Sequence, residues 1–583
     1  MRKLIFGLVL GIACSAFAET APVADRVAKQ NALFEESYQN FLKNFPERAT
    51  AFGDYRYNDK LGEVSLADLA RQHAQGDDFL ARLKAIPTDG MSDQDLLSHR
   101  MMQHQIERED VNYALKNFEM PVNQQNGVHT RLADLPNAVP FDSVPHYQDY
   151  ISRLHQIPRV LEQTTEVMKQ GEKDGLMPPK FLLEKLPGQC DGIIKANPFL
   201  EPTKKFPKEF SDADKKLITD EMTKAINDDV LPAYKKFADF IRSEYAPKGR
   251  TTLSVESLAD GKRRYAEAVK TMTTTNVPPA EIHEIGLKEI ARITAEMTKL
   301  AQNNGYKDLA SFRDAINKDP KWKPTSEQQI LDTYKKYIAQ MEPKLPELFG
   351  LLPKSPVTVE PIPDFAKAAA THYVQGTPDG KRAGRVVVAV SDPAKRTLTD
   401  DEAVAYHEGV PGHHMQISIA QTLEGLPKFR LHGFYPAYAE GWALYSEELG
   451  KEIGFYKDPV SDYGRLSSEM LRAVRLVVDT GIHDKNWSRE QVVDYMHAND
   501  LNDAMVQTEA DRYIAWPGQA LAYKMGQLTI LKLRDEAKTQ LGDKFDIKKF
   551  HDEILNGGAM PLELLQQRVE NWITAQKKVT SGA

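Results

Sequence analysis

Cysteine is nearly absent from this chain: its 583 residues include two, Cys14 and Cys190. Cys14 lies in an apolar N-terminal segment. If that segment is removed, a single cysteine remains and no intrachain disulfide can form. The fold must then be stabilised by burial of apolar side chains, and a chain of this length can bury a large core.

Long apolar runs and an excess of positive charge are missing as well. Beyond the N-terminal segment, no stretch approaches the roughly 20 apolar residues that a membrane-spanning helix needs. The formal net charge of −8 gives no reason to expect nucleic acid as a partner. No glycine-rich phosphate loop is found, and nothing marks a Ser-His-Asp triad. A charged fraction of 27% is typical of a soluble globular protein.

Residues 1–18 have the pattern of a secretory signal peptide. A positively charged start precedes an apolar segment over 4–13, and small residues at Ala16 and Ala18 form a cleavage site. A competing interpretation is a lipoprotein-type site at Cys14, to which the preceding residues are a weak match. We favour cleavage after Ala18 and predict a periplasmic or secreted protein.

The rest of the chain has mainly helical periodicity. Apolar residues recur at three- and four-residue spacing over 66–83, 145–170 and 217–245. A further helix is predicted from Pro279, because proline is favoured at the first helical position, and its apolar stripe extends to Met297. We therefore predict a mainly α protein.

A change in composition divides the chain. Residues 246–262 are rich in Pro, Gly, Ser and Thr, which indicates a soft boundary. We predict an N-terminal helical half over 19–250 and a C-terminal half over 251–583 that carries the chemistry. The two halves are expected to form one cleft.

A short segment interrupts the helical pattern. The β-branched run over 385–390 predicts a strand, with which 357–360 and 371–374 could pair. The edge of such a sheet can hydrogen-bond an extended peptide, so Val388 is a candidate for substrate binding. The alternative is a hairpin that only packs on helices.

Residues 407–414, with the sequence HEGVPGHH, bring three histidines and one glutamate close together in the chain. Histidine is a common metal ligand, and a glutamate beside it suits a general base that deprotonates water. On a straight helix, His413 would sit about 240° round from His407 and ~9 Å along the axis. Because Pro411 and Gly412 break helices, we predict a helix end near Gly409, a turn, and a restart that returns His413 to His407. The alternative is two surface helices with incidental histidines.

A third metal ligand is expected further along the chain. A catalytic zinc needs three protein ligands and an open position for water. Glu440 follows His413 by 27 residues in an apolar setting that is poor for an unpaired charge, so it is our third ligand. Glu447, two turns later on the same face, is the reserve. Residues 399–402, with Thr399 first and Glu402 last, match a capping box and are predicted to begin the helix that bears His407.

Together these motifs resemble the zinc metallopeptidases whose third ligand is a glutamate on a second helix. The similarity is greatest to their helical, deep-cleft branch, which includes angiotensin-converting enzyme and thermostable carboxypeptidase. More closely, most of the chain resembles a large bacterial family, mostly secreted and poorly characterised, that carries H-E-x-x-P-G-H-H. Its further marks here are residues 439–443, 479–483 and 517–520.

The resemblance implies roles for several residues. It favours His413 over His414 as the second ligand, because its Gly-His pair aligns with that of the well-studied peptidases. Arg512-Tyr513 resembles a pair in angiotensin-converting enzyme whose tyrosine donates to the oxyanion. Tyr513 is therefore the candidate for that role, and Tyr523 is the reserve.

Other late residues are candidates for supporting roles. Asp479 and His483 stand one helical turn apart, in a row with Arg475. They could orient a metal ligand from behind, or form a plain salt-bridged row. Arg512 and Lys524 could anchor the C-terminal carboxylate of a substrate.

The combined prediction is a secreted zinc peptidase that hydrolyses short peptides, with Glu408 as general base. Because of the cationic anchors, a carboxypeptidase or dipeptidyl carboxypeptidase is favoured over an aminopeptidase. One alternative is a zinc amidase or esterase acting on a non-peptide envelope component. Another is a zinc-bearing binding protein without turnover, which needs no base such as Glu408. The sequence does not determine the oligomeric state.

Overall fold

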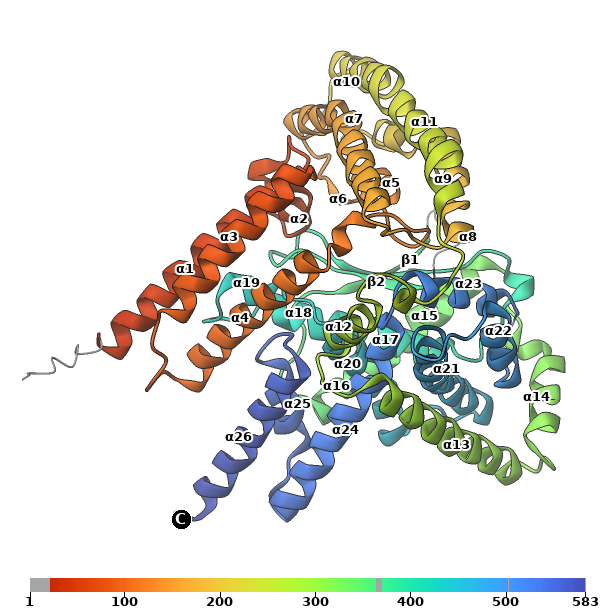
Figure 1. Ribbon diagram of the computed structural model, residues 1–583. Helices are drawn as coiled ribbons and strands as arrows, with labels where there is room; N and C mark the ends of the chain where they lie inside the picture. The colour runs from red at the N-terminus through yellow and green to blue at the C-terminus, as the bar shows by residue number, and fades with distance from the viewer. Residues whose placement is uncertain (1–20, 363–369, 502, 582–583) are drawn as a thin grey trace, which may run out of the picture.

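Helices form nearly all of the regular structure in the computed structural model, which describes residues 21–362, 370–501 and 503–581 (Figure 1). Within these ranges there is one three-stranded sheet. The predicted mainly α fold with a small sheet is therefore confirmed. The predicted signal peptide over 1–18 and the alternative site at Cys14 lie outside the described residues. No helix in the described part of the chain is long and apolar enough to cross a membrane.

The N-terminal half is built from amphipathic helices, as the apolar periodicity predicts. In Figure 1 the first four helices form an arm on one side, and α7 to α11 stand above the sheet. The helices are α1 (Val23–Asn44), α2 (Pro46–Ala51), α3 (Leu66–Lys84), α4 (Asp93–Ala114), α5 (Val128–Ala133), α6 (Leu135–Ala138), α7 (Val144–Lys173), α8 (Lys180–Leu183), α9 (Leu186–Ala196), α10 (Asp212–Ala225) and α11 (Leu231–Phe240).

The C-terminal half surrounds the segment with the clustered histidines. It contains α12 (Gly261–Thr273), α13 (Pro279–Asn303), α14 (Leu309–Lys318), α15 (Glu327–Met341), α16 (Leu345–Leu348), α17 (Asp401–Glu408), α18 (His413–Gln421), α19 (Lys428–Leu431), α20 (Pro436–Glu452), α21 (Pro459–His483), α22 (Arg489–Ala498), α23 (Asp503–Ala515), α24 (Ala522–Leu541), α25 (Ile547–Leu555) and α26 (Leu562–Ser581). The helix predicted from Pro279 begins at that residue.

Two glycines let α20 and α24 cross at close range. A Cβ atom added at Gly441 would overlap the backbone of Gly526, and one added at Gly526 would overlap the carbonyl oxygen of Ala437. Glycine is therefore required on both sides of the crossing, because any side chain would force the helices apart. The crossing fixes the position of Glu440 on α20 relative to Tyr523 on α24.

The small sheet has the order β1-β3-β2. β3 (Gly384–Val388) pairs in parallel with β1 (Val357–Pro361) and antiparallel with β2 (His372–Val374), so all three predicted strands form. Because β3 is the central strand, both of its hydrogen-bonding edges face protein. Val388 is fully buried, and its carbonyl oxygen accepts from the amide of Ile362 at 2.9 Å. β1 thus occupies one edge of β3 at Val388, which argues against the predicted binding of substrate there.

Two large clusters of buried apolar residues make up most of the hydrophobic core. One cluster of buried apolar residues lies wholly within 61–246. A second large cluster is built mostly from residues 322–573 and surrounds α17, α20 and α24. Polar contacts join the halves: Gln124 donates to the carbonyl oxygen of Asp511 at 2.9 Å, and Lys185 pairs with the Asp511 carboxylate.

Candidate metal centre

The turn between α17 and α18 decides where the two histidines point. α17 ends at Glu408 and α18 begins at His413, while the amide of Gly412 donates to the carbonyl oxygen of Tyr406 at 3.0 Å. A Cβ atom at Gly412 would overlap the carbonyl oxygens of Tyr406 and His407. Only glycine lets the chain return so closely. The predicted break and restart of the helix are confirmed to within one residue.

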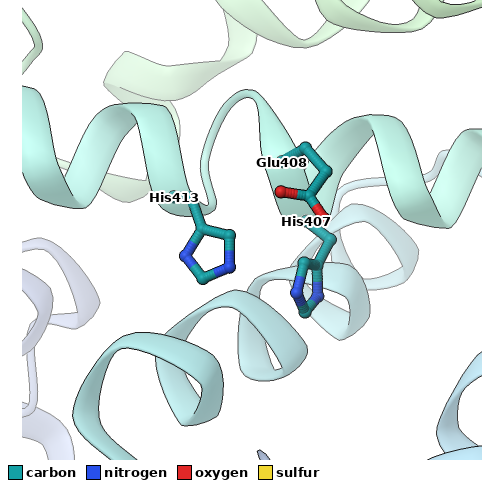
Figure 2. Close-up of side chains that lie close together, drawn as sticks. All are labelled: His407, Glu408 and His413. Atoms are coloured by element: carbon teal, nitrogen blue, oxygen red, sulfur yellow. The ribbon is translucent and has the colours of Figure 1, made fainter. Parts of the chain in front are cut away.

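His407 and His413 lie on the same side of this turn (Figure 2). Their ring centres are 4.8 Å apart and their planes are nearly perpendicular, at 89°. Together with Glu408 they offer three ligand atoms that all lie within 4.8 Å of one another. The turn therefore gathers two imidazoles and a carboxylate into a group that could hold a metal ion.

Glu440 approaches this group from α20. Its Oε2 atom lies 3.5 Å from Nε2 of His407 and 3.3 Å from Nε2 of His413. Tetrahedral zinc with ligand bonds of about 2.0–2.1 Å would separate its ligand atoms by about 3.3–3.4 Å. The two distances therefore fit a single metal ion bound between Glu440 and the two imidazoles. Two carboxylates, those of Glu408 and Glu440, are close enough to take part.

The other ring nitrogen of His407 is held by Glu447. Nδ1 donates to Glu447 Oε1 at 2.8 Å, which directs Nε2 towards Glu440. Glu447 is almost fully buried, and Arg472 lies 3.6 Å from the same oxygen. A carboxylate behind a ligating histidine fixes the tautomer and orientation of the ring. Glu447, the reserve ligand from the sequence, thus lies where it orients His407.

The charges at this centre favour a cation. Burial lowers the pKa of His407, but hydrogen bonds to Glu440 and Glu447 outweigh burial and raise the pKa to about 10. Burial raises the pKa of Glu440, and the charge of His413 together with hydrogen bonds from both imidazoles reverses this, so the pKa lies well below its usual value. The carboxylates thus stabilise positive charge between the two rings. A bound metal ion would supply such a charge.

His414 points away from the group. Its Nε2 donates to the carbonyl oxygen of Ser355 at 3.0 Å, and its Nδ1 faces the hydroxyl of Tyr373 at 3.1 Å. Burial lowers the pKa of His414 to about 4, so the ring is neutral. Both ring nitrogens thus contact residues in or next to the small sheet. His414, the reserve ligand, therefore lies outside the candidate centre.

The predicted capping box at the start of α17 is wrong. Asp400 occupies the N-cap position without a side-chain hydrogen bond to the helix. The Glu402 carboxylate instead accepts from the hydroxyl of Tyr406 at 3.0 Å and from the amide of Tyr456 at 3.2 Å. Tertiary partners outcompete the local cap here because the start of α17 is buried.

The two candidate tyrosines have different neighbours. The ring of Tyr523 lies 6.4 Å from the ring of His407 and nearly parallel to it. The hydroxyl of Tyr513 donates to Glu509 and accepts from Arg475 at 3.1 Å. Because the hydroxyl hydrogen of Tyr513 is already donated, the geometry favours Tyr523, the reserve residue, as a donor near the metal group.

The two predicted cationic anchors have different surroundings. Arg512 donates to the hydroxyl of Tyr523 at 3.1 Å, so it lies beside the candidate centre, and it also pairs with Glu509 at 3.2 Å. Lys524 is fully buried and pairs with Glu469 at 2.6 Å and Glu289 at 2.8 Å. Carboxylates enclose its ammonium group, which argues against the prediction that Lys524 binds substrate.

Asp479 and His483 do not contact the metal group. Asp479 accepts from the hydroxyl of Tyr265 at 2.7 Å and from the amide of Gly518, and burial raises its pKa to about 7. His483 contacts the carbonyl oxygen of Tyr513 at 3.0 Å, and burial lowers its pKa to about 3. The structure therefore places both behind the α23–α24 segment rather than behind His407.

Several contacts at the site were missed by the sequence analysis. The indole of Trp442 donates to the carbonyl oxygen of Pro411 at 2.9 Å and ties α20 to the histidine turn. Glu509 pairs with Arg475 at 2.8 Å, and Gln519 binds Arg512. Glu447 was named only as a ligand, although its position two turns after Glu440 was a usable signal that it faces the same centre.

The fold and the site together define a mainly α-helical protein with a buried His-Glu-His group that could hold a metal ion. The chain belongs to a family described as "Bacterial protein of unknown function (DUF885)", whose model matches residues 46–569. No curated protein matches the chain.

Two solved structures are similar over nearly the whole length. The "putative lipoprotein from Colwellia psychrerythraea" is 28% identical, with a TM-score of 0.88, and the alignment covers 94% of this chain and 100% of that one. A "putative lipoprotein of unknown function from Shewanella oneidensis" is 17% identical, with a TM-score of 0.71 and coverage of 93% and 99%. The second likeness shows the fold alone.

Proposed function

We propose that this protein is a secreted, zinc-dependent peptidase that acts on short peptides. The observation that carries the proposal is the convergence of Glu440 Oε2 on Nε2 of His407 and of His413, with the Glu408 carboxylate beside them. Two histidines and one glutamate are a frequent ligand set of catalytic zinc in peptidases. The similar solved structures described as lipoproteins support a location outside the cytoplasm, as does the predicted signal peptide.

Glu408 is the proposed general base. When bound, zinc would supply Lewis-acid activation of a water molecule and of the substrate carbonyl. In the described part of the chain, no hydrogen bond or ion pair engages the Glu408 carboxylate, so its oxygens are free to accept a proton. Glu408 would take that proton from the attacking water and deliver it to the leaving amine.

Tyr523 and Arg512 are the proposed donors to the substrate. The hydroxyl of Tyr523 accepts from Arg512, so its own hydrogen remains available for the oxygen that becomes negative during attack. The guanidinium of Arg512 lies next to this hydroxyl and suits a carboxylate. A substrate cut near its C-terminus would place its terminal carboxylate there, which favours a carboxypeptidase or dipeptidyl carboxypeptidase.

The test begins with metal analysis of the purified protein. We expect about one zinc per chain, and chelation should remove zinc and activity together. Turnover is then followed by mass spectrometry on one short peptide with a free C-terminus and on the same peptide with an amidated C-terminus. The free form should be cut faster, because only this form offers a carboxylate to Arg512.

A panel of small esters and non-peptide amides separates the proposed peptidase from the alternative enzyme. Ester hydrolysis without peptide cleavage would replace the peptidase by the amidase or esterase. Zinc binding without any turnover would replace both by a binding protein. Equal rates on the free and amidated peptides, or removal of residues from the amino end, would contradict the C-terminal anchor.

A further inference from the structure

Helix α21 presents two buried polar residues, Asp479 and His483, to the connection between α23 and α24. Neither residue is exposed at all, and neither contacts the metal group. α23 ends at Ala515 and α24 begins at Ala522, so Gly518 lies in the connection between them. A polar side chain buried at this depth needs a partner, so the identity of the partner shows what the residue does.

His483 holds the last turn of α23, directly before the connection. The amide of Val255 donates to its Nδ1 at 3.2 Å, so Nδ1 is the acceptor and Nε2 carries the hydrogen. Nε2 therefore donates to the carbonyl oxygen of Tyr513 at 3.0 Å. The hydroxyl of Ser254 donates to the carbonyl oxygen of His483 at 2.7 Å, which fixes the end of α21 as well.

Asp479 holds the end of the connection. The amide of Gly518 donates to both carboxylate oxygens, at 3.1 and 3.0 Å, and the hydroxyl of Tyr265 adds a third contact at 2.7 Å. Gly518 has a φ of +79°, a conformation that glycine adopts without strain. The carboxylate thus selects one conformation of a backbone position that would otherwise have several.

The helix that carries both residues is itself held firmly. A Cβ atom added at Gly286 on α13 would come within 2.8 Å of the side chains of Leu476 and Val477, so α13 and α21 pack with almost no space between them. Arg475, one turn before Asp479, adds contacts to Glu509 and to the hydroxyl of Tyr513. α21 is therefore a rigid support for the segment that follows Glu509.

We propose that Asp479 and His483 are positioning residues that clamp the α23–α24 connection, so that Arg512 on one side and Tyr523 on the other face the metal group together. The connection links these two residues, and Arg512 donates to the hydroxyl of Tyr523 only if both helix ends are held in register. The role rests on the proposed function, because Arg512 and Tyr523 act there on the substrate.

Hydrogen exchange of the zinc-loaded full chain tests the clamp without any activity. Asp479→Asn and His483→Gln should both speed amide exchange over 513–521, while zinc content stays at the wild-type value. His283→Gln is the matched control. His283 is also buried against α21, bonded to Thr480 at 2.8 Å, but it does not contact the connection. Unchanged exchange over 513–521 in both variants would overturn the clamp.

A milder substitution keeps the test decisive if those variants do not fold. Tyr265→Phe removes one hydrogen bond to Asp479 and keeps its carboxylate, so exchange over 513–521 should rise by less. No rise in Tyr265→Phe would then overturn the clamp as well. The exchange result is read separately from turnover, so an inactive wild-type protein would refute the peptidase without deciding the clamp.

Turnover supplies the readout that a purely structural role would not move. Asp479→Asn should lower turnover by about 10- to 100-fold, as is typical for a residue that orients an active group. In a Tyr523→Phe background the same substitution should cost much less, because the group that it positions has already lost its hydroxyl. Fully additive losses would contradict a role through Tyr523 and would leave the zinc peptidase standing.

Discussion

The two halves of the molecule bury polar groups in different ways. In the N-terminal half, buried tyrosine hydroxyls donate to backbone carbonyl oxygens, such as Tyr147 to Pro202 at 3.0 Å and Tyr234 to His129 at 2.7 Å. Even the fully buried Arg153 binds mostly carbonyl oxygens, among them that of Lys60 at 2.8 Å. Backbone carbonyl oxygens thus supply most of the hydrogen bonds that these buried groups need.

In the C-terminal half, buried charged side chains bind one another. His407 is held by Glu447, and Arg475 pairs with Glu509. Such clusters shift the pKa of their members: burial raises the pKa of Glu509, but Arg475 and Arg512 outweigh this and lower it to about 2. Perturbed, mutually dependent charges are typical of functional sites, whereas backbone-satisfied groups are typical of scaffolds. The comparison supports the proposal that the chemistry lies in the C-terminal half.

The largest effect is expected when an imidazole of the metal group is removed. His413→Ala should abolish zinc binding and turnover, because it leaves too few ligands. His414→Ala should keep both, since its ring bonds Ser355 and Tyr373 instead. Zinc titration of the two variants is the measurement. A greater loss of zinc affinity in His414→Ala would reverse the assignment and require a different turn at 409–412.

The next effect separates the two carboxylates of the metal group. Glu408→Gln should keep zinc and lower turnover by about 10²–10⁴-fold, because an amide cannot accept the proton of water. Glu440→Gln is the matched variant and should lose zinc. Metal content and kcat are measured for both. If Glu408→Gln lost zinc and Glu440→Gln kept it, the roles of ligand and base would have to be exchanged.

A smaller effect distinguishes the two tyrosines. Tyr523→Phe should lower kcat by about 10²–10³-fold, as is typical for removal of one donor to a developing oxyanion. Tyr513→Phe should change kcat less, because its hydroxyl serves Glu509. The two kcat values, measured at saturating peptide, decide between them. A greater fall in Tyr513→Phe would restore the residue favoured by sequence resemblance.

Glu447→Gln should weaken zinc binding by about 10- to 100-fold, the usual range for the partner of a ligating histidine. The amide can still accept from Nδ1 of His407 but lacks the charge that strengthens the imidazole as a ligand. Competition with a chelator measures the affinity. Wild-type affinity would show that the buried pair of Glu447 and His407 stabilises the fold and does not tune the metal group.

The smallest effect on function is expected from Arg153→Met. The substitution leaves buried carbonyl oxygens without a donor, which should lower the free energy of unfolding by about 1–3 kcal/mol. Zinc affinity and turnover should stay at wild-type values. Denaturant unfolding and zinc titration are compared in the same preparation. A loss of zinc affinity would break the contrast between the halves.

The sequence by itself determined the helices, the strands and the core of the candidate metal centre. Apolar spacing located α3, α7 and α13, because a helix buries one face whatever it packs against. The short distance between His407 and His413 along the chain, with a helix break between them, left few ways to place their rings. These features depend on local backbone geometry, and the local sequence specifies it.

Only the tertiary structure decided which long-range partner each polar residue finds. Lys524 and Arg512 look alike in sequence, but α24 turns Lys524 towards Glu289 and Glu469, while Arg512 stays beside Tyr523. In the same way, the Glu402 carboxylate accepts a hydrogen bond from the amide of Tyr456 and does not cap its own helix. The physical reason is that burial penalises an unpaired charge by more than any local preference offers. The partner is therefore set by whichever helix packs alongside, and the packing of distant helices is not encoded in the spacing of one segment.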